Sequence, residues 1–350
     1  MTSSPKSKKK NKHKKSELTQ AESRSVNSTK ADGDSGSTKQ LRLELPSHFY
    51  KKSPLPKPLE SIDVTDFVKM PIPKPSKLLG NWLLSQGLCM IYGARGGGKT
   101  FLAVEIACAV SAGQDLFGWK CAQPQKVVYL DGEMSSGMLQ SRIRAIPMKR
   151  RPKEGMLKIV TPDFQPGVQP DLGNREEQVL INVAIDRDTK LIIVDNLSSW
   201  SKSGREDSET WAPIAEWALR HRSEGRAVIF IHHSGKAGTQ RGTSRREDLL
   251  DAVLALTRPH KTSNSGACFE IRFEKNRHLV GADVEPITVR LIKDEKDKHE
   301  WEWEPVQDDP TERLDQIVKL KEEGLNQSQI AEKLGVDRST VSRAIKGARS

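Results

Sequence analysis

Short apolar runs alternate with longer, more polar stretches from about residue 82 onward. Predominantly apolar runs of four or five residues, each typical of a buried strand, occur at 88–92, 127–130, 157–160, 191–194 and 227–231. Helix-like stretches separate several of them, and strands that are buried on both faces are typical of a parallel sheet covered by helices. The pattern therefore predicts an α/β domain with a mostly parallel sheet.

Two later segments, 268–273 and 287–292, alternate apolar and polar residues instead. Alternation is typical of strands with one exposed face, so these segments predict an antiparallel extension at the edge of the sheet. The charged stretch 293–300 and the segment 304–310 follow the extension. We predict a hinge there.

The C-terminal segment fits a small all-α domain. A helix at 314–323 precedes two further helices within 325–345, where Ala331 is small at the helix crossing, Gly335 permits a tight turn and Asp337 can cap the last helix. The apolar residues that would bury the seam are Ile330, Leu334, Val341 and Ile345.

This segment resembles the helix-turn-helix of resolvases and many bacterial regulators. The resemblance implies a recognition helix that enters the major groove of duplex DNA. The residues that this helix would present to DNA are Arg338, Ser339, Thr340, Ser342 and Arg343. A three-helix module that binds another protein through the same core is the alternative.

The N-terminal segment adds charge without adding a core. Residues 1–55 contain 13 Lys and Arg against 5 Asp and Glu, within a chain of 350 residues and net charge +11. Such a segment buries too little apolar surface to fold, so it is either a solubilising tail or a non-specific DNA-binding arm. The predicted organisation is a disordered basic tail at 1–55, a Pro-rich linker at 56–78, an α/β domain at 79–303, a linker at 304–311 and the helix-turn-helix domain at 312–350.

The cysteines and the hydropathy pattern exclude two classes of protein. The four cysteines show no C-x-x-C spacing, which indicates reduced thiols in a cytosolic protein. No apolar run approaches the roughly 18–20 residues that span a bilayer, and the N-terminus is rich in Lys where a signal peptide needs apolar residues. We therefore expect a cytoplasmic location and no membrane partner.

Residues 93–100, Gly-Ala-Arg-Gly-Gly-Gly-Lys-Thr, match the phosphate-binding P-loop pattern G-x-x-x-x-G-K-[ST] between a predicted strand and a predicted helix. Gly93, Gly96 and Gly98 allow backbone conformations in which successive N–H groups face a phosphate. Lys99 then reaches the β- and γ-phosphate oxygens, and the Thr100 hydroxyl takes a position on Mg²⁺. The segment therefore predicts a site for ATP and Mg²⁺.

Acidic residues follow two of the predicted strands. Asp195 ends the apolar run 191–194, the arrangement that supplies a second anchor for Mg²⁺ in P-loop proteins. Asp131 and Glu133 end the run 127–130, on the edge of the sheet where ligands of α/β proteins bind. We predict Glu133 as the general base that activates water. Asp131 competes for that role, or caps the loop.

Two more segments carry polar residues toward the same edge. His232 and His233 follow the run 227–231 and can sense a γ-phosphate, although two solvated or capping histidines would give the same sequence. The basic, Gly-rich segment 238–246 contains Arg241. It can place an arginine finger in a neighbouring subunit's site or grip DNA phosphates, or it is a solvated loop.

Together these motifs resemble the RecA-like AAA ATPases of the plasmid RepA replicative-helicase type. The P-loop, Glu133, Asp195, the His232-His233 pair and Arg241 with its following Gly-Thr-Ser occur in the order of that family, over roughly residues 79–303. The resemblance implies a RecA-like P-loop core that hydrolyses ATP with Mg²⁺. It also implies a homo-oligomeric ring, commonly a hexamer, with nucleotide between subunits and single-stranded DNA in the central channel.

The resemblance also assigns roles by position. Lys99 and Thr100 bind phosphate and Mg²⁺, Asp195 coordinates Mg²⁺ and Glu133 activates water. His233 or His232 is the sensor, and Arg241 is the arginine finger. Lys275 or Arg277 is a second candidate for action on a neighbouring subunit.

Two function hypotheses follow. The first is an ATP-driven DNA helicase or translocase for replication of a plasmid or other mobile element, recruited by its own helix-turn-helix. The second is a DNA-binding regulator of transcription, recombination or helicase loading, whose ATPase switches assembly without unwinding. The basic tail and the C-terminal domain depart from a minimal helicase, and relatives with the same core motifs include weak translocases.

Overall fold

The computed structural model describes residues 60–202, 208–233, 248–259, 267–277, 279, 284–293, 298–306, 310–334, 336 and 338–347. The predicted basic tail at 1–55 lies outside these residues. So do the basic segment with Arg241 and two residues of the predicted helix-turn-helix, Gly335 and Asp337.

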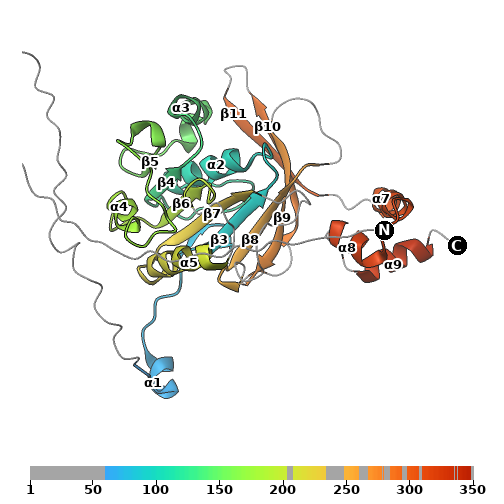
Figure 1. Cartoon of the computed structure of the whole chain (residues 1–350), viewed down its shortest axis with the longest axis horizontal. Coiled ribbons are helices and arrows are strands. Elements are labelled where there is room, and N and C mark those ends of the chain that lie inside the picture. The colour runs from blue at the N-terminus through green and yellow to red at the C-terminus, as the bar shows by residue number, and fades with distance from the viewer. Residues whose placement is uncertain are drawn as a thin grey trace, which may run out of the picture. The chain divides into compact units, whose positions relative to one another are not determined.

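A nine-stranded sheet forms the centre of the described structure, in the order β11-β10-β9-β8-β3-β7-β6-β4-β5 (Figure 1). Its parallel strands are β3 (Leu88–Gly93), β4 (Val127–Asp131), β5 (Leu157–Val160), β6 (Leu191–Asp195), β7 (Ala227–His233) and β8 (Ala252–Thr257). The five predicted strand runs all lie in this parallel part. The predicted α/β fold class with a mostly parallel sheet is confirmed.

The antiparallel extension is also present, with one more strand than predicted. It consists of β9 (Cys268–Asn276), β10 (Ile287–Lys293) and β11 (His299–Pro305). The prediction of a hinge is wrong for residues 299–300 and 304–305, because they belong to β11, which pairs with β10 along its whole length. Trp301 anchors β11 to the domain: its ring packs against Phe117 and Phe269, and its indole N–H donates to Glu105 (2.8 Å).

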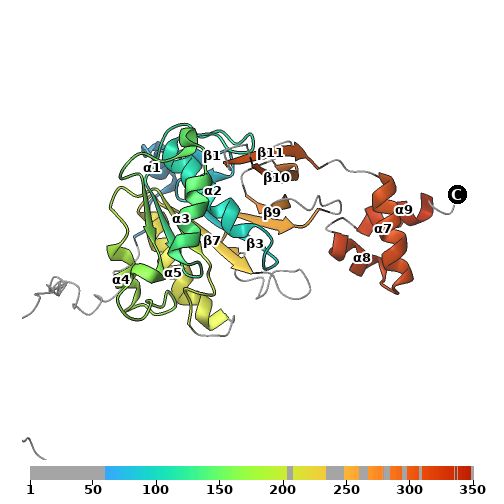
Figure 2. The same ribbon diagram turned by 90° about the horizontal axis from the view of Figure 1, so that it is seen from above.

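Helices cover both faces of the parallel strands (Figures 1 and 2). On one face α2 (Lys99–Ala112) and α3 (Ser136–Ala145) pack into one buried cluster. On the other, α4 (Gln178–Val183) and α5 (Ser208–Ser223) pack into a second. Alternate residues of β3 enter the two clusters, Cys89 and Ile91 the first and Leu88 and Met90 the second. Both faces of the parallel part of the sheet are therefore apolar, so polar side chains can gather only at the ends of its strands.

Short elements precede and join these layers. The segment predicted as a Pro-rich linker contains α1 (Val64–Lys69), which begins where the Asp63 carboxylate accepts a hydrogen bond from Thr65 N (2.8 Å). No side chain of α1 is buried. The remaining short elements are the β1 (Lys77–Leu79) and β2 (Leu83–Leu84) pair and the 3-10 turns η2 (Met148–Arg150) and η3 (Pro162–Phe164).

The C-terminal segment forms α7 (Pro310–Glu322), α8 (Gln327–Leu334) and α9 (Arg338–Gly347). Of the predicted seam, Ile330, Val341 and Ile345 are buried and Leu334 is partly buried against them. Asn326 and Gln329 start α8 as a capping box: Asn326 Oδ1 accepts from Gln329 N (3.0 Å), and Gln329 Oε1 accepts from Asn326 N (2.9 Å). The helical helix-turn-helix segment is therefore confirmed.

Candidate nucleotide-binding site

The P-loop connects β3 to α2 and depends on glycine at two places. Gly96 and Gly98 have φ angles of 72° and 91°, which L-residues with a Cβ rarely adopt. A Cβ on Gly98 would also lie 2.5 Å from Cδ1 of the Phe269 ring. At the end of β3, a Cβ on Gly93 would lie 2.6 Å from the Leu256 carbonyl oxygen. All three predicted glycines therefore occupy positions where the backbone needs them or where the fold leaves no room for a side chain.

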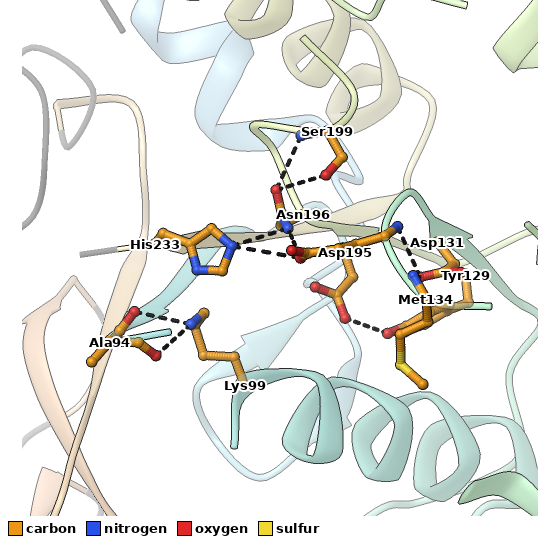
Figure 3. A network of polar contacts seen from close by, with 11 residues as sticks. Ala94, Lys99, Tyr129, Asp131, Met134, Asp195, Asn196, Ser199 and His233 are labelled. Atoms are coloured by element: carbon orange, nitrogen blue, oxygen red, sulfur yellow. Dashed lines mark hydrogen bonds and ion pairs between the residues drawn. The ribbon is translucent and has the colours of Figure 1, made fainter. Parts of the chain in front are cut away.

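Lys99 is the first residue of α2, and its side chain turns back into the loop. Its Nζ donates to the carbonyl oxygens of Gly93 (2.9 Å) and Ala94 (2.8 Å) (Figure 3). Burial lowers the pKa of Lys99, while the nearby Asp195 and Glu133 carboxylates act in the opposite direction. The ammonium group is thus held against the P-loop backbone. Negatively charged phosphate oxygens would be stronger hydrogen-bond acceptors for it than the neutral carbonyl oxygens that it now contacts.

Asp195 ends β6 inside this site, and its carboxylate contacts two hydroxyl groups. Tyr129 on β4 donates to Asp195 Oδ2 (2.5 Å), and the Thr100 hydroxyl hydrogen-bonds the same carboxylate. Burial raises the pKa of Asp195, and these two hydrogen bonds lower it. A hydroxyl of the P-loop beside a buried carboxylate is a donor set that Mg²⁺ prefers, since hard cations take oxygen ligands. The residues present therefore fit Mg²⁺ held by Thr100 and Asp195.

Tyr129 is a site residue that the sequence analysis missed. It lies within an apolar run and faces the buried cluster below α2, so its ring has the signature of core packing. The available signal was its position two residues before Asp131, which places Tyr129 and Asp131 on the same face of β4. Register then sets Asp131 opposite Asp195.

We expect Tyr129→Phe to raise the Mg²⁺ concentration for half-maximal ATP hydrolysis by about tenfold, because partners that orient a ligating carboxylate typically contribute 10–100-fold to metal affinity. A Mg²⁺ titration of the hydrolysis rate measures it. Tyr92→Phe is the matched control, since Tyr92 is buried in the cluster on the opposite face of the sheet. An unchanged Mg²⁺ dependence in Tyr129→Phe would show that the hydroxyl does not act on the metal site.

Glu133 and His233 meet at the ends of β4 and β7, where both also contact the Asn196 side chain. Glu133 Oε2 accepts a hydrogen bond from Asn196 Nδ2, and His233 Nε2 lies 3.6 Å from Glu133 Oε2. Burial and the Lys99 charge lower the pKa of His233, against the effect of Glu133. His233, and not His232, is the histidine at this rim, because strand alternation turns His232 into the interior, where it is 1% exposed.

Asp131 makes the loop-capping contacts that were the alternative to a catalytic role. Its Oδ1 accepts from Met134 N (3.2 Å) and Glu133 N (3.4 Å), and Gly132 N donates to the Asp195 carbonyl oxygen (2.8 Å). Burial raises the pKa of Asp131. These bonds fix the turn that carries Glu133 out to the rim.

Residues 53–239 match a family model described as an AAA domain, and residues 309–350 match one described as a homeodomain-like domain. The first match covers more than half of the 350 residues. The chain belongs to the AAA domain family. It is a P-loop ATPase with a C-terminal helix-turn-helix, and no curated protein matches it.

The helix-turn-helix of this AAA-domain protein exposes the predicted DNA-facing residues to different degrees. Arg338, Ser339 and Arg343 are exposed on α9, and Thr340 and Ser342 are partly buried. Arg343 Nε points back along the helix to the Ser339 carbonyl oxygen (3.4 Å). The opposite side of α9 carries Val341 and Ile345 into the three-helix core.

The candidates for action on a neighbouring subunit are placed in part. Arg241 lies outside the described residues of this AAA-domain protein. Arg277 follows β9 near the start of β8, where its guanidinium lies 3.6 Å from Asp251. Lys275 pairs in register with Val253, also near the start of β8. Because β8 runs parallel to β3, both residues lie beside the beginnings of these strands, whereas the P-loop of the same chain follows the end of β3.

No helix in the described parts of the chain is long and apolar enough to cross a membrane.

Proposed function

We propose that this AAA-domain protein is an ATP-driven DNA helicase or translocase of a plasmid or other mobile element, of the RepA type. The observation that carries the proposal is the convergence of Lys99, the Thr100–Asp195 pair and Glu133 at one rim of the sheet. A phosphate-binding lysine, a magnesium site and a carboxylate that can accept a proton are what ATP hydrolysis needs. The helix-turn-helix in the same chain supports DNA as the partner.

Each residue then has a role set by its position. Lys99 and the P-loop N–H groups bind the β- and γ-phosphates, and Glu133 orients water and accepts its proton. Thr100 and Asp195 hold Mg²⁺, which neutralises charge that develops on the phosphates. His233 lies where a γ-phosphate can be sensed. Arg241 of one subunit completes the site of its neighbour in a ring, commonly a hexamer, with single-stranded DNA in the channel.

One observation favours a second candidate, an ATPase-switched regulator that binds DNA without unwinding it. A recognition helix with exposed Arg338 and Arg343 is typical of a protein that binds duplex DNA, and DNA unwinding does not require such a helix. Under this proposal ATP binding changes the assembly state on a duplex site. The P-loop chemistry is the same in both candidates.

Unwinding of a forked DNA duplex by the purified full chain separates the two. The helicase proposal requires strand separation that depends on ATP and Mg²⁺ and stops in Lys99→Ala. ATP hydrolysis with duplex binding but no strand separation, on forks with either a 5′ or a 3′ tail, favours the regulator. Absence of ATP hydrolysis with and without DNA would refute both.

We expect Arg338→Ala and Arg343→Ala each to weaken binding to the preferred duplex site about 10–100-fold, because a bidentate base contact contributes about 1–3 kcal/mol. Binding to unrelated duplex should change little. Binding-site selection on the full chain identifies the site, and titration at fixed salt measures the loss. Lys333→Ala on α8 is the matched control, since Lys333 is an exposed cation on a different helix. Failure to enrich any sequence would instead favour a protein-interaction module.

A further inference from the structure

Asn196 lies between two residues proposed to act on the nucleotide. It follows Asp195 at the end of β6, the strand between β7 and β4, and it is 1% exposed. Its Nδ2 donates to Glu133 Oε2 and lies 3.2 Å from His233 Nε2 (Figure 3), and these last two atoms are 3.6 Å apart. Building on the proposed ATPase function, we infer that Asn196 is a positioning residue whose side-chain amide sets the orientation of Glu133 and the tautomer of His233 together.

The orientation of the Asn196 amide is fixed by its other end. Asn196 Oδ1 accepts from the backbone N of Ser199 (3.0 Å) and from Ser199 Oγ (3.2 Å). A backbone N–H can only donate, so the oxygen of the amide must face Ser199. The Nδ2 group, with both of its hydrogens, therefore faces Glu133 and His233.

This orientation determines the state of His233. Two groups face His233 Nε2: Asn196 Nδ2 at 3.2 Å and Glu133 Oε2 at 3.6 Å, so the amide is the nearer partner. Because Nδ2 has only hydrogens to offer, His233 Nε2 accepts from it, and the neutral ring then carries its proton on Nδ1. His233 Nδ1 is buried and finds no hydrogen-bond partner among the residues that the structure describes.

The same amide connects His233 to the proposed general base. Glu133, Asn196 and His233 extend from the ends of three neighbouring strands, β4, β6 and β7, so a displacement of one ring or carboxylate changes its contact with the shared Nδ2 group. The segment 234–247, which contains Arg241, follows His233 directly in the sequence. A change in the position of the His233 ring is therefore felt at Glu133 through the Asn196 amide as well as across the direct 3.6 Å contact between the two side chains.

Asn196→Asp tests this role with little change in size. The variant keeps an oxygen acceptor for Ser199 N, so the turn is retained, but an oxygen replaces the donor that faces Glu133 and His233. We expect kcat for ATP hydrolysis to fall about a hundredfold, within the range that general-base catalysis contributes, while KM changes by less than about threefold. Facing an acceptor, His233 must place a proton on Nε2.

Nitrogen-15 NMR of histidine-labelled full chain measures the tautomer without any turnover. The chain has eight histidines, and the His233 signals are assigned by their loss in His233→Gln. We expect Nδ1–H with an unprotonated Nε2 in the wild type and a protonated Nε2 in Asn196→Asp. Ser199→Ala is the matched control: it removes one donor to Oδ1 but keeps the backbone N–H, so kcat and tautomer should stay as in the wild type.

Two results would overturn the inference. A loss of kcat in Asn196→Asp with an unchanged His233 tautomer would reduce Asn196 to a structural turn residue. A changed tautomer with wild-type kcat would show that Glu133 is not positioned through the amide. If the wild-type chain hydrolyses no ATP, the proposed function fails, whereas a wild-type tautomer with a protonated Nε2 refutes the Asn196–His233 contact itself.

Discussion

Glu133→Gln should bind ATP with wild-type affinity and hydrolyse it at least about a hundredfold more slowly, since general-base catalysis contributes about 10²–10⁴-fold. The amide has nearly the shape of the carboxylate but cannot accept the proton of the attacking water. The contact with Asn196 need not be lost, because the amide of Gln also has an oxygen that can accept from Asn196 Nδ2. Binding of a fluorescent ATP analogue and phosphate release, measured on the same preparation, separate the two quantities.

Lys99→Ala is the companion variant and should fail differently. It removes the ammonium group that now lies against the Gly93 and Ala94 carbonyl oxygens, so both nucleotide binding and hydrolysis should be lost. Lys149→Ala is a control of the same residue type, because Lys149 is exposed on η2. Turnover at the wild-type rate in Glu133→Gln would show that Glu133 is not the general base, and Asp131 would then be the remaining candidate for that role.

Arg241→Ala should abolish most of the turnover of an assembled ring, because an arginine finger contributes roughly 10³–10⁵-fold to the rate. A finger that acts on the neighbouring subunit adds nothing to the site of its own subunit. Mixing Arg241→Ala with Lys99→Ala subunits should therefore restore part of the activity, since some interfaces then pair an intact P-loop with an intact Arg241. Hydrolysis measured across mixing ratios, with each variant alone as reference, tests this.

A second measurement, ATP turnover per subunit over a series of protein dilutions, provides the control for the mixing experiment. Turnover per subunit of the wild type should fall on dilution as the ring dissociates. Arg246→Ala is a matched variant, because Arg246 lies in the same basic segment but outside the Arg-Gly-Thr-Ser pattern. If neither mixing nor dilution changes turnover per subunit, Arg241 does not act between subunits.

The sequence determined the parts of this protein that depend on local rules. The five apolar runs became β3 to β7, because short apolar runs separated by helices are typical of strands in a covered parallel sheet. The expectation that each run is buried is wrong for β5, which lies at the edge of the sheet and has two exposed residues. The P-loop was predictable because its glycines and Lys99 are adjacent in the chain. The apolar spacing likewise predicted α8 and α9, and the Asn326–Gln329 capping box that starts α8 also lies within four adjacent residues.

Only the tertiary structure decided which distant side chains meet. Asn196 and Trp301 carry no local signal for their roles, and the signal for Tyr129 is only its place two residues before Asp131. Each role depends on contacts between segments that are far apart in sequence. The histidine pair was ambiguous in sequence, and strand alternation then buried His232 and left His233 at the rim. Contacts across a sheet follow from strand order and pairing, and these are set by the packing of the whole domain rather than by any one segment.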